Sequence, residues 1–156
     1  MQDLPIDQRI RQLEDRSALK SLVDTFSNLA DTKDIQKQVL LFTEDATVDS
    51  YFDGVCVSSL KGRKQIGDAF DAYLATFNTV YHINGQQTVE LEQDHARGTS
   101  YCLVVLIGQD GGISVRTTSG VIYKDTYVRV DGSWLIQSRV SNFSWRARQR
   151  ITAADT

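Results

Sequence analysis

One of the two histidines in this sequence stands where it could carry acid–base chemistry. His82 lies in the stretch Tyr81-His82-Ile83-Asn84-Gly85, near the expected start of a strand. An imidazole changes protonation near neutral pH, so His82 could serve as a general base. Its position alone favours a simpler interpretation, a histidine that fills a place in a sheet. His95 lies in a charged turn segment, residues 94–98, and is expected to be exposed.

Asp31 is the candidate partner for His82, because it closes the first expected helix. A carboxylate is disfavoured at a helix C-terminus unless another group pairs with it. A neutral histidine that donates its Nδ1–H would be such a group, and the aspartate would fix the tautomer and stabilise the imidazolium. This pairing predicts a pKa of His82 above its ordinary value. The alternative is an ordinary polar turn residue, of which Asp34 is an example.

An arginine and two tyrosines could complete a polar site. Arg139 lies in the last expected strand, and an arginine on an inward face must be paired or must meet an anionic group. An edge arginine with its head in water is the alternative, and a single bulge would reverse the face. Tyr51 and Tyr101 could add hydroxyl groups, although tyrosines in strands more often serve packing. Of the two, Tyr51 is preferred.

Other kinds of chemistry find little support in the sequence. It contains no G-x-S-x-G nucleophile elbow, no P-loop and no G-x-G-x-x-G motif. Cys56 and Cys102 match no metal-ligand spacing, and two isolated histidines do not support a zinc site. Both thiols are expected to be buried in strands. We therefore expect neither a metal nor a cofactor.

The composition is that of one ordinary globular domain. A net charge of −3 over 156 residues provides no basic field for nucleic acid or an anionic membrane. No apolar run approaches the roughly 18 residues that span a bilayer, and the charged N-terminus is unlike a signal peptide. We expect a cytoplasmic protein with a single domain over residues 1–156. Its core would be about 8–146, and residues 147–156 would form a solvated tail.

The hydrophobic periodicity changes along the chain and sets the expected fold. Helices are expected at 6–31, 35–42 and 63–77, and strands at 46–52, 55–60, 80–92, 98–108, 113–130 and 133–146. Short turns containing glycine between the last four strands imply an antiparallel meander. The class is α+β, a cone-shaped half-barrel with a curved antiparallel sheet wrapped around N-terminal helices.

The mouth of such a cone is a common ligand site. Phe26, Val48 and Phe143 are available to line it with apolar surface, which suits a small, mostly apolar molecule, cyclic compounds included. Four long strands also leave a sheet face that needs covering. We therefore expect a homodimer or a higher homo-oligomer, packed sheet to sheet.

Four stretches, together with the element order, resemble the nuclear transport factor 2-like superfamily in its SnoaL-like branch. They are FSNLADTKD, FTEDATVDSY, TVYHING and YVRVDGSWLIQSR, and the resemblance covers about residues 8–146. Within this branch the chain is similar to scytalone dehydratase, bile-acid 7α-dehydratase and hexachlorocyclohexane dehydrochlorinase. That resemblance implies an Asp–His dyad at Asp31 and His82, a site arginine at Arg139, five residues after Trp134, and a pocket tyrosine at Tyr51.

The accessory residues depart from these relatives. Ala30 stands where scytalone dehydratase has a tyrosine, its second catalytic histidine has no counterpart, and Val48 stands where the dehydrochlorinase has a pocket tryptophan. The resemblance thus implies a small-molecule lyase of the dehydratase type, with His82 as base and no particular substrate. Isomerisation by proton shuttling in the same pocket is one alternative. A non-catalytic ligand-binding or assembly module of the same fold is the other.

Overall fold

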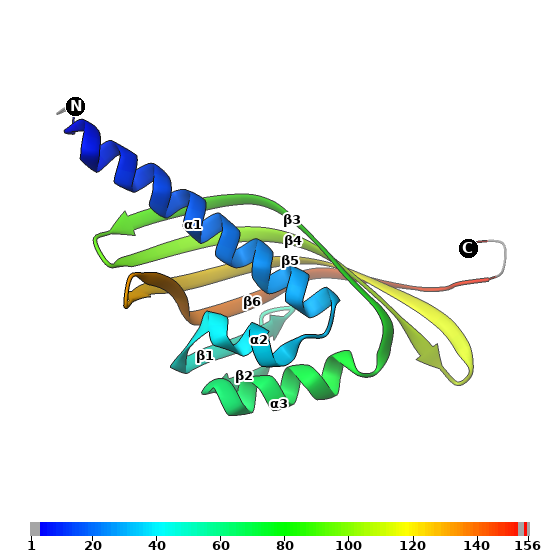
Figure 1. Ribbon diagram of the computed structural model, residues 1–156. Helices are drawn as coiled ribbons and strands as arrows, with labels where there is room; N and C mark the ends of the chain where they lie inside the picture. Colours follow the sequence, from blue (N-terminus) through cyan, green and yellow to red (C-terminus); the bar gives the residue numbers. More distant parts are fainter. Residues whose placement is uncertain (1–3, 153–154, 156) are drawn as a thin grey trace.

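The computed structural model describes residues 4–152 and 155 and forms three helices packed against a six-stranded sheet (Figure 1). The helices are α1 (Ile6–Asp31), α2 (Ile35–Gln38), which continues into a 3₁₀ turn (Val39–Leu41), and α3 (Arg63–Leu74). The strands are β1 (Phe42–Phe52), β2 (Val55–Lys61), β3 (Phe77–Glu92), β4 (His95–Asp110), β5 (Ile113–Val130) and β6 (Ser133–Arg150). The expected α+β class is confirmed.

The order of strands in the sheet is β2-β1-β6-β5-β4-β3. Strands β3 to β6 pair antiparallel in sequence, which confirms the predicted meander. One pair departs from the expected antiparallel arrangement, because β1 pairs parallel to β6. No tight turn joins these two strands, so nothing in the local sequence forces them to run in opposite directions.

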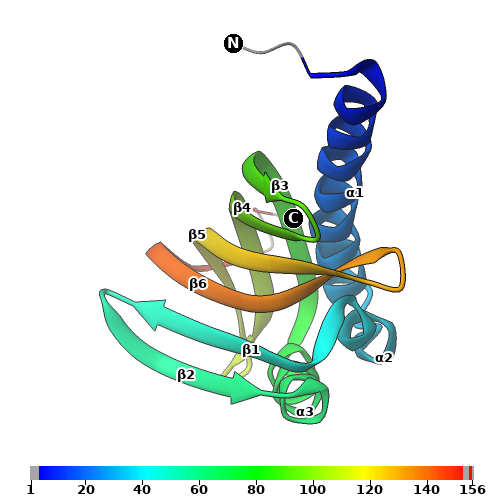
Figure 2. The ribbon, with the colours of Figure 1, turned by 90° about the vertical axis from the view of Figure 1, so that its left-hand side faces the viewer.

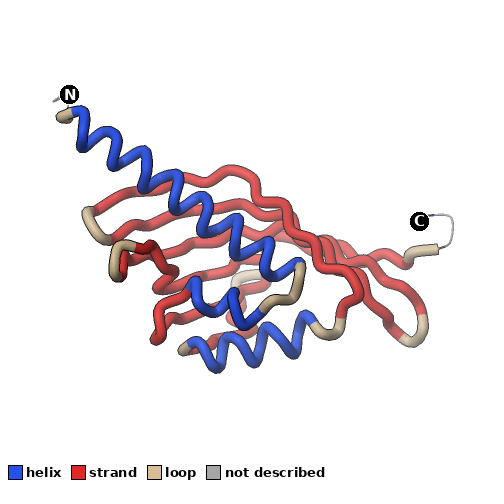
Figure 3. The backbone as a smooth tube through the Cα atoms, viewed as in Figure 1, coloured by secondary structure: helices blue, strands red, loops and turns tan. Residues whose placement is uncertain are grey.

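The sheet is curved and unclosed, with β2 and β3 as its two edges (Figure 2). The helices all lie against one face of it (Figure 3). Bulges bend strands, and the pairing register shifts at Ser50/Tyr51, Asn84/Gln87, Gly120/Val121 and Thr126/Tyr127. The core fills the concave side, where Leu19, Phe42, Ile66, Tyr127 and Ile136 are completely buried. None of the helices within residues 4–152 is long and apolar enough to cross a membrane.

Several element boundaries differ from those expected. The first strand begins at Phe42 instead of residue 46, α3 ends at Leu74 instead of 77, and β3 begins at Phe77 instead of 80. β6 continues to Arg150, because Arg148, Gln149 and Arg150 pair with the start of β5. Pairing with a neighbouring strand thus orders a basic segment that resembled a solvated tail. Residues 153, 154 and 156 of that expected tail lie outside the described residues.

A buried carboxylate fastens α1 to the far end of the meander. Asp15 accepts two hydrogen bonds from Nη2 of Arg129, at 2.8 and 2.9 Å, and one from Nε1 of Trp134 at 3.0 Å. The guanidinium of Arg129 lies over the indole ring of Trp134, 4.4 Å from its centroid. Because Asp15 is buried, its negative charge depends on these donors in place of water.

We predict that Asp15→Ala lowers the free energy of unfolding by about 2–4 kcal/mol, because it leaves an indole N–H and a guanidinium without their acceptor. Urea denaturation monitored by circular dichroism measures this change. Asp68→Ala removes the exposed ion pair of Asp68 with Lys64 and should have no measurable effect. Equal losses in the two variants would contradict a structural role for Asp15.

Candidate functional site

A cavity of about 150 Å³ lies between the helices and the concave face of the sheet. Its size matches that of cavities able to hold one benzene-sized ring. The lining is largely apolar, with Phe26, Ala30, Val48, Phe70, Leu74, Val104, Leu106 and Phe143. The polar members are Gln38, Ser50, Tyr73, His82, Ser119, Tyr123, Arg139, Ser141 and Arg146. The expected apolar residues Phe26, Val48 and Phe143 are therefore on the wall.

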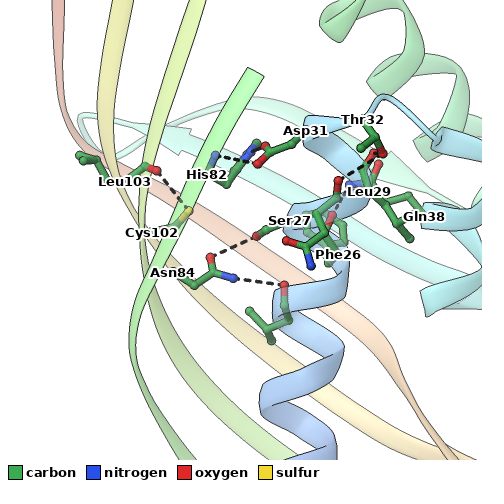
Figure 4. Close-up of polar contacts among 12 residues, drawn as sticks. Phe26, Ser27, Leu29, Asp31, Thr32, Gln38, His82, Asn84, Cys102 and Leu103 are labelled. Carbon is green, nitrogen blue, oxygen red and sulfur yellow. Dashed lines mark hydrogen bonds and ion pairs between the residues drawn. The ribbon is translucent and has the colours of Figure 1, made fainter. Parts of the chain in front are cut away.

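Asp31 contacts His82 (Figure 4), and His82 lines this cavity. Oδ1 of Asp31 lies 2.6 Å from Nδ1 of His82, and Oδ2 accepts the backbone N–H of His82 at 3.2 Å. Asp31 ends α1, whose last turn contains no basic side chain, so His82 supplies the donors that this carboxylate needs. β3 is an edge strand, which leaves a backbone N–H on its outer side free for the helix.

Strand alternation turns the His82 side chain toward the cavity and its neighbours away from it. The imidazole is 8% exposed, whereas Tyr81 and Ile83 are 53% and 51% exposed on the opposite face of the sheet. With Asp31 as acceptor, the proton of a neutral His82 ring resides on Nδ1. Nε2 then keeps its lone pair and is the nitrogen able to take a proton.

Burial decides the charge of His82. Desolvation lowers the pKa of His82 below its ordinary value of 6.5, the hydrogen bond and charge of Asp31 raise it, and Arg139 lowers it again. The net shift is downward, so the raised pKa expected from pairing alone is wrong. The ring is thus neutral at pH 7. The lowered pKa also makes the free energy of unfolding depend on pH. It is unaffected by His82 above about pH 6.5 and decreases as pH falls through the folded-state pKa, because the unfolded chain takes up the proton first.

Arg139 also lines the cavity, but most of its charge is already paired. Its Nε and Nη2 donate to the two carboxylate oxygens of Asp125, each at 2.8 Å, and the two side chains are 1% and 0% exposed. The guanidinium is stacked between the rings of Phe26 and Tyr123, at 4.2 and 4.0 Å. Burial disfavours the charged form, but Asp125 outweighs it and raises the pKa of Arg139.

Asp125 is a residue that the sequence analysis missed. A two-residue turn at Asp131-Gly132 would pair Asp125 with Ser138, one residue short of Arg139. The bulge beside Tyr127 shifts the register by one residue and brings Asp125 opposite Arg139. The sequence alone places this carboxylate one residue away from Arg139 across the tight turn, which could have identified it as a candidate partner. The bulge then brings the two residues directly opposite each other.

Two expected pocket tyrosines do not line the cavity. Tyr101 is 42% exposed on the outer face of the sheet, beside Leu103. Tyr51 follows Ser50, which does line the cavity, and the bulge between them leaves Tyr51 paired with Cys56 on the edge strand. The expectation that these two hydroxyls enter the pocket is therefore wrong. Tyr73 and Tyr123 are the tyrosines on the wall.

Cys56 and His95 lie apart from this chemistry, whereas the Cys102 thiol interacts with Tyr123 on the cavity wall. Cys102 is buried, and burial raises the pKa of its thiol to about 11, whereas Cys56 is exposed, contrary to expectation. His95 is exposed, as expected. Among residues 4–152 and 155, no three His, Cys, Asp or Glu side chains are grouped to hold a metal ion.

We predict that Asp31→Asn lowers the pKa of His82 further, because Asp31 is the group that raises it against burial. Titration of the imidazole resonances by NMR measures the shift, with the His82 signal assigned by its loss in His82→Ala. Asp34→Asn, three residues away at the N-cap of α2, should leave the His82 titration unchanged. A rise in the His82 pKa in Asp31→Asn would contradict the pairing.

Comparison with solved structures finds the same fold in proteins of low sequence identity. A proposed scytalone dehydratase from Novosphingobium aromaticivorans is 20% identical, with a TM-score of 0.74 over 91% of this chain and 92% of that chain. Hexachlorocyclohexane dehydrochlorinase, LinA type 2, is 16% identical, with a TM-score of 0.76 over 93% and 94%. A proposed aromatic ring hydroxylase from N. aromaticivorans is 23% identical, with a TM-score of 0.76 over 99% and 100%.

These identities are low enough that the likeness establishes the fold alone. No curated protein sequence matches the chain. The family model of the SnoaL-like domain, however, matches residues 11–140, which include both Asp31 and His82 and nearly all of the elements that enclose the cavity. The chain therefore belongs to the SnoaL-like family.

Proposed function

We propose that this protein is a small-molecule lyase that catalyses a dehydratase-type elimination without a cofactor. The observation that carries the proposal is the 2.6 Å contact between Asp31 and a neutral, buried His82 on the wall of an apolar cavity. A base of this kind in a largely apolar cavity suits removal of a proton from carbon. The dehydratase and dehydrochlorinase names of two structural neighbours support the same class of reaction.

In the proposed reaction, Nε2 of His82 removes a proton from the carbon next to a carbonyl group. Asp31 holds the ring in place and stabilises the imidazolium that forms. The electron pair of the broken C–H bond moves into an enolate, whose oxygen is stabilised by Arg139. The enolate then forms the C=C bond as the C–O bond to a neighbouring hydroxyl breaks. That hydroxyl takes the proton back from His82 and departs as water.

Arg139 is better placed to stabilise negative charge that develops on the substrate during the reaction than to bind a substrate that is already an anion. Its bidentate pair with Asp125 is neutral overall and buried, so Arg139 itself offers little positive potential to a preformed anion. An N–H at the edge of a rigid, stacked guanidinium can nevertheless stabilise an oxygen as its negative charge grows. Phe26, Val48 and Phe143 would contact the apolar body of the substrate.

Isomerisation is the alternative that uses the same base. Here His82 would return the proton to a different carbon of the substrate, and no water would be released. Non-catalytic binding in the same cavity is the other alternative, since this fold hosts several unrelated functions. Analysis of the product distinguishes them: elimination yields water and an alkene, isomerisation yields an isomer, and binding alone leaves the ligand unchanged.

We also propose that the protein forms a homodimer through the outer face of its sheet. Ile83, Leu103, Gly120 and Trp145 lie in register across β3, β4, β5 and β6 on this face. Ile83, Leu103 and Trp145 are 51%, 38% and 48% exposed, and Tyr101 adjoins them. An apolar row of this extent on a long sheet is typical of an interface.

We predict that His82→Ala lowers the rate of proton abstraction by about 10²–10⁴-fold. A screen of small cyclic hydroxy-ketones, followed by mass spectrometry for loss of water and by NMR for deuterium exchange, measures it. His95→Ala, which removes the exposed histidine, is the matched control and should retain full activity. Equal activity of wild type and His82→Ala on every substrate found would rule out the mechanism.

The pH dependence follows from the lowered pKa of His82. The rate should rise as pH increases through that pKa, below 6.5, and level off near neutral pH, where the base is fully deprotonated. In Asp31→Asn the acidic limb of the profile should move to lower pH, with a lower plateau. An acidic limb above pH 6.5 in the wild type would contradict the burial of the base.

For the interface, we predict that Leu103→Glu converts the dimer to a monomer or weakens association by at least about 30-fold. Size-exclusion chromatography with light scattering, over a range of concentrations, measures the mass. Val57→Glu places the same charge on an exposed apolar residue of β2, outside the row, and should leave the mass unchanged. A monomeric wild type would refute the proposal.

A further inference from the structure

Three buried side-chain atoms among the described residues have no hydrogen-bond partner: Oε1 of Gln38, Oγ of Ser100 and Nη1 of Arg139. Two of the three, Gln38 and Arg139, belong to residues that line the cavity. Unpaired buried polar atoms are uncommon in native proteins because each one costs free energy. Two of these unpaired atoms therefore belong to residues that also line a ligand-sized cavity.

The orientation of the Gln38 amide is set by its other end. Gln38 ends α2 and is 1% exposed, and its Nε2 donates to the backbone oxygen of Phe26 at 3.1 Å. A carbonyl oxygen can only accept a hydrogen bond, so the nitrogen must face Phe26 and the oxygen is left over. Oε1 of Gln38 is therefore an acceptor held in a fixed place without a donor.

Phe26 links this acceptor to the unpaired donor of Arg139. Its backbone oxygen holds Gln38, and its ring covers one face of the Arg139 guanidinium at 4.2 Å. Asp125 occupies Nε and Nη2 of Arg139, so Nη1 is the nitrogen that remains. Two residues that line the same cavity thus carry one unpaired hydrogen-bond acceptor and one unpaired donor, and Phe26 contacts both of them.

We propose that Gln38 determines ligand specificity by accepting a hydrogen bond from a hydroxyl group, while Nη1 of Arg139 donates to a carbonyl oxygen of the same ligand. The inference rests on the proposed function and names its substrate class, a small hydroxy-carbonyl compound. A halogen or a hydrogen in place of the hydroxyl offers no proton to Gln38, and its burial would leave the acceptor unpaired. The cavity therefore favours a hydroxylated ligand over its chlorinated counterpart.

A carbonyl is favoured over a carboxylate as the second group. Asp125 cancels the charge of Arg139, and its Oδ2 also accepts from the hydroxyl of Tyr127 at 2.9 Å, which secures the pair in place. A carboxylate beside Arg139 would lose its hydration and would meet an Arg139–Asp125 pair with no net charge. A neutral carbonyl oxygen needs only the one N–H that Arg139 has left.

The test compares binding of matched compounds by isothermal titration calorimetry. The probes are the positional isomers of hydroxycyclohexanone, their chloro counterparts and cyclohexanone itself. Binding is also measured in His82→Ala, so that turnover does not deplete the ligand. We expect at least one hydroxy isomer to bind wild type about 10-fold more tightly than its chloro and unsubstituted counterparts.

In Gln38→Leu this preference should fall to less than about 2-fold, because no acceptor remains to be satisfied. Gln137→Leu makes the same substitution at an exposed glutamine outside the cavity and should keep the full preference. Gln38→Glu is a rescue variant: a buried glutamic acid stays protonated at low pH, where its OH can donate to Phe26 and its carbonyl can accept. The preference should then be present at acidic pH and decline as pH rises.

An unchanged preference in Gln38→Leu would overturn the inference, and so would a wild type that binds no hydroxy isomer more tightly than its counterparts. Failure of this inference can be distinguished from failure of the proposed elimination. A hydroxyl preference that depends on Gln38, together with equal turnover by wild type and His82→Ala, would retain the ligand class and reject the elimination. Loss of turnover in His82→Ala, with no preference for hydroxylated ligands, would retain the elimination and reject the ligand class.

Discussion

The contact between Asp31 and His82 joins the end of α1 to the edge strand β3. The site depends on two opposing effects on the pKa of His82 at this contact. Burial removes water from the imidazole and disfavours its charged form, whereas the carboxylate favours that form. Because burial prevails, the ring stays neutral and can accept a proton. Because Asp31 is present, the imidazolium would still be tolerated once formed. Either effect alone would provide a poorer base.

A second pair, Arg139 with Asp125, brings polarity into the same cavity without a net charge. Stacking between Phe26 and Tyr123 holds the guanidinium in one plane, so the direction of its free N–H is fixed. Phe26 contributes its ring to this stack and its backbone oxygen to Gln38. A mostly apolar cavity therefore contains a few polar atoms in defined positions, which is how small ligand sites combine affinity with orientation.

The sheet separates two surfaces by the alternation of its side chains. On the concave side His82, Val104 and Ser119 lie across neighbouring strands and face the cavity. One residue along, Ile83 and Leu103 face outward and remain exposed. A shift of one residue in register exchanges the two surfaces, so the bulges decide which side chains reach the cavity.

The sequence by itself determined the elements and the order in which they occur, because hydrophobic periodicity and turn residues act over short distances. It was enough to predict helix 6–31, the meander, and the pair Asp31 and His82 as candidates. Only the tertiary structure decided which groups are buried together. It determined the lowered pKa of His82, the pairing of Arg139 with Asp125, the absence of Tyr51 and Tyr101 from the cavity wall, and the unpaired acceptor on Gln38. Those outcomes depend on burial and register between segments far apart in the chain, and a difference of one residue in pairing changes which side chains meet.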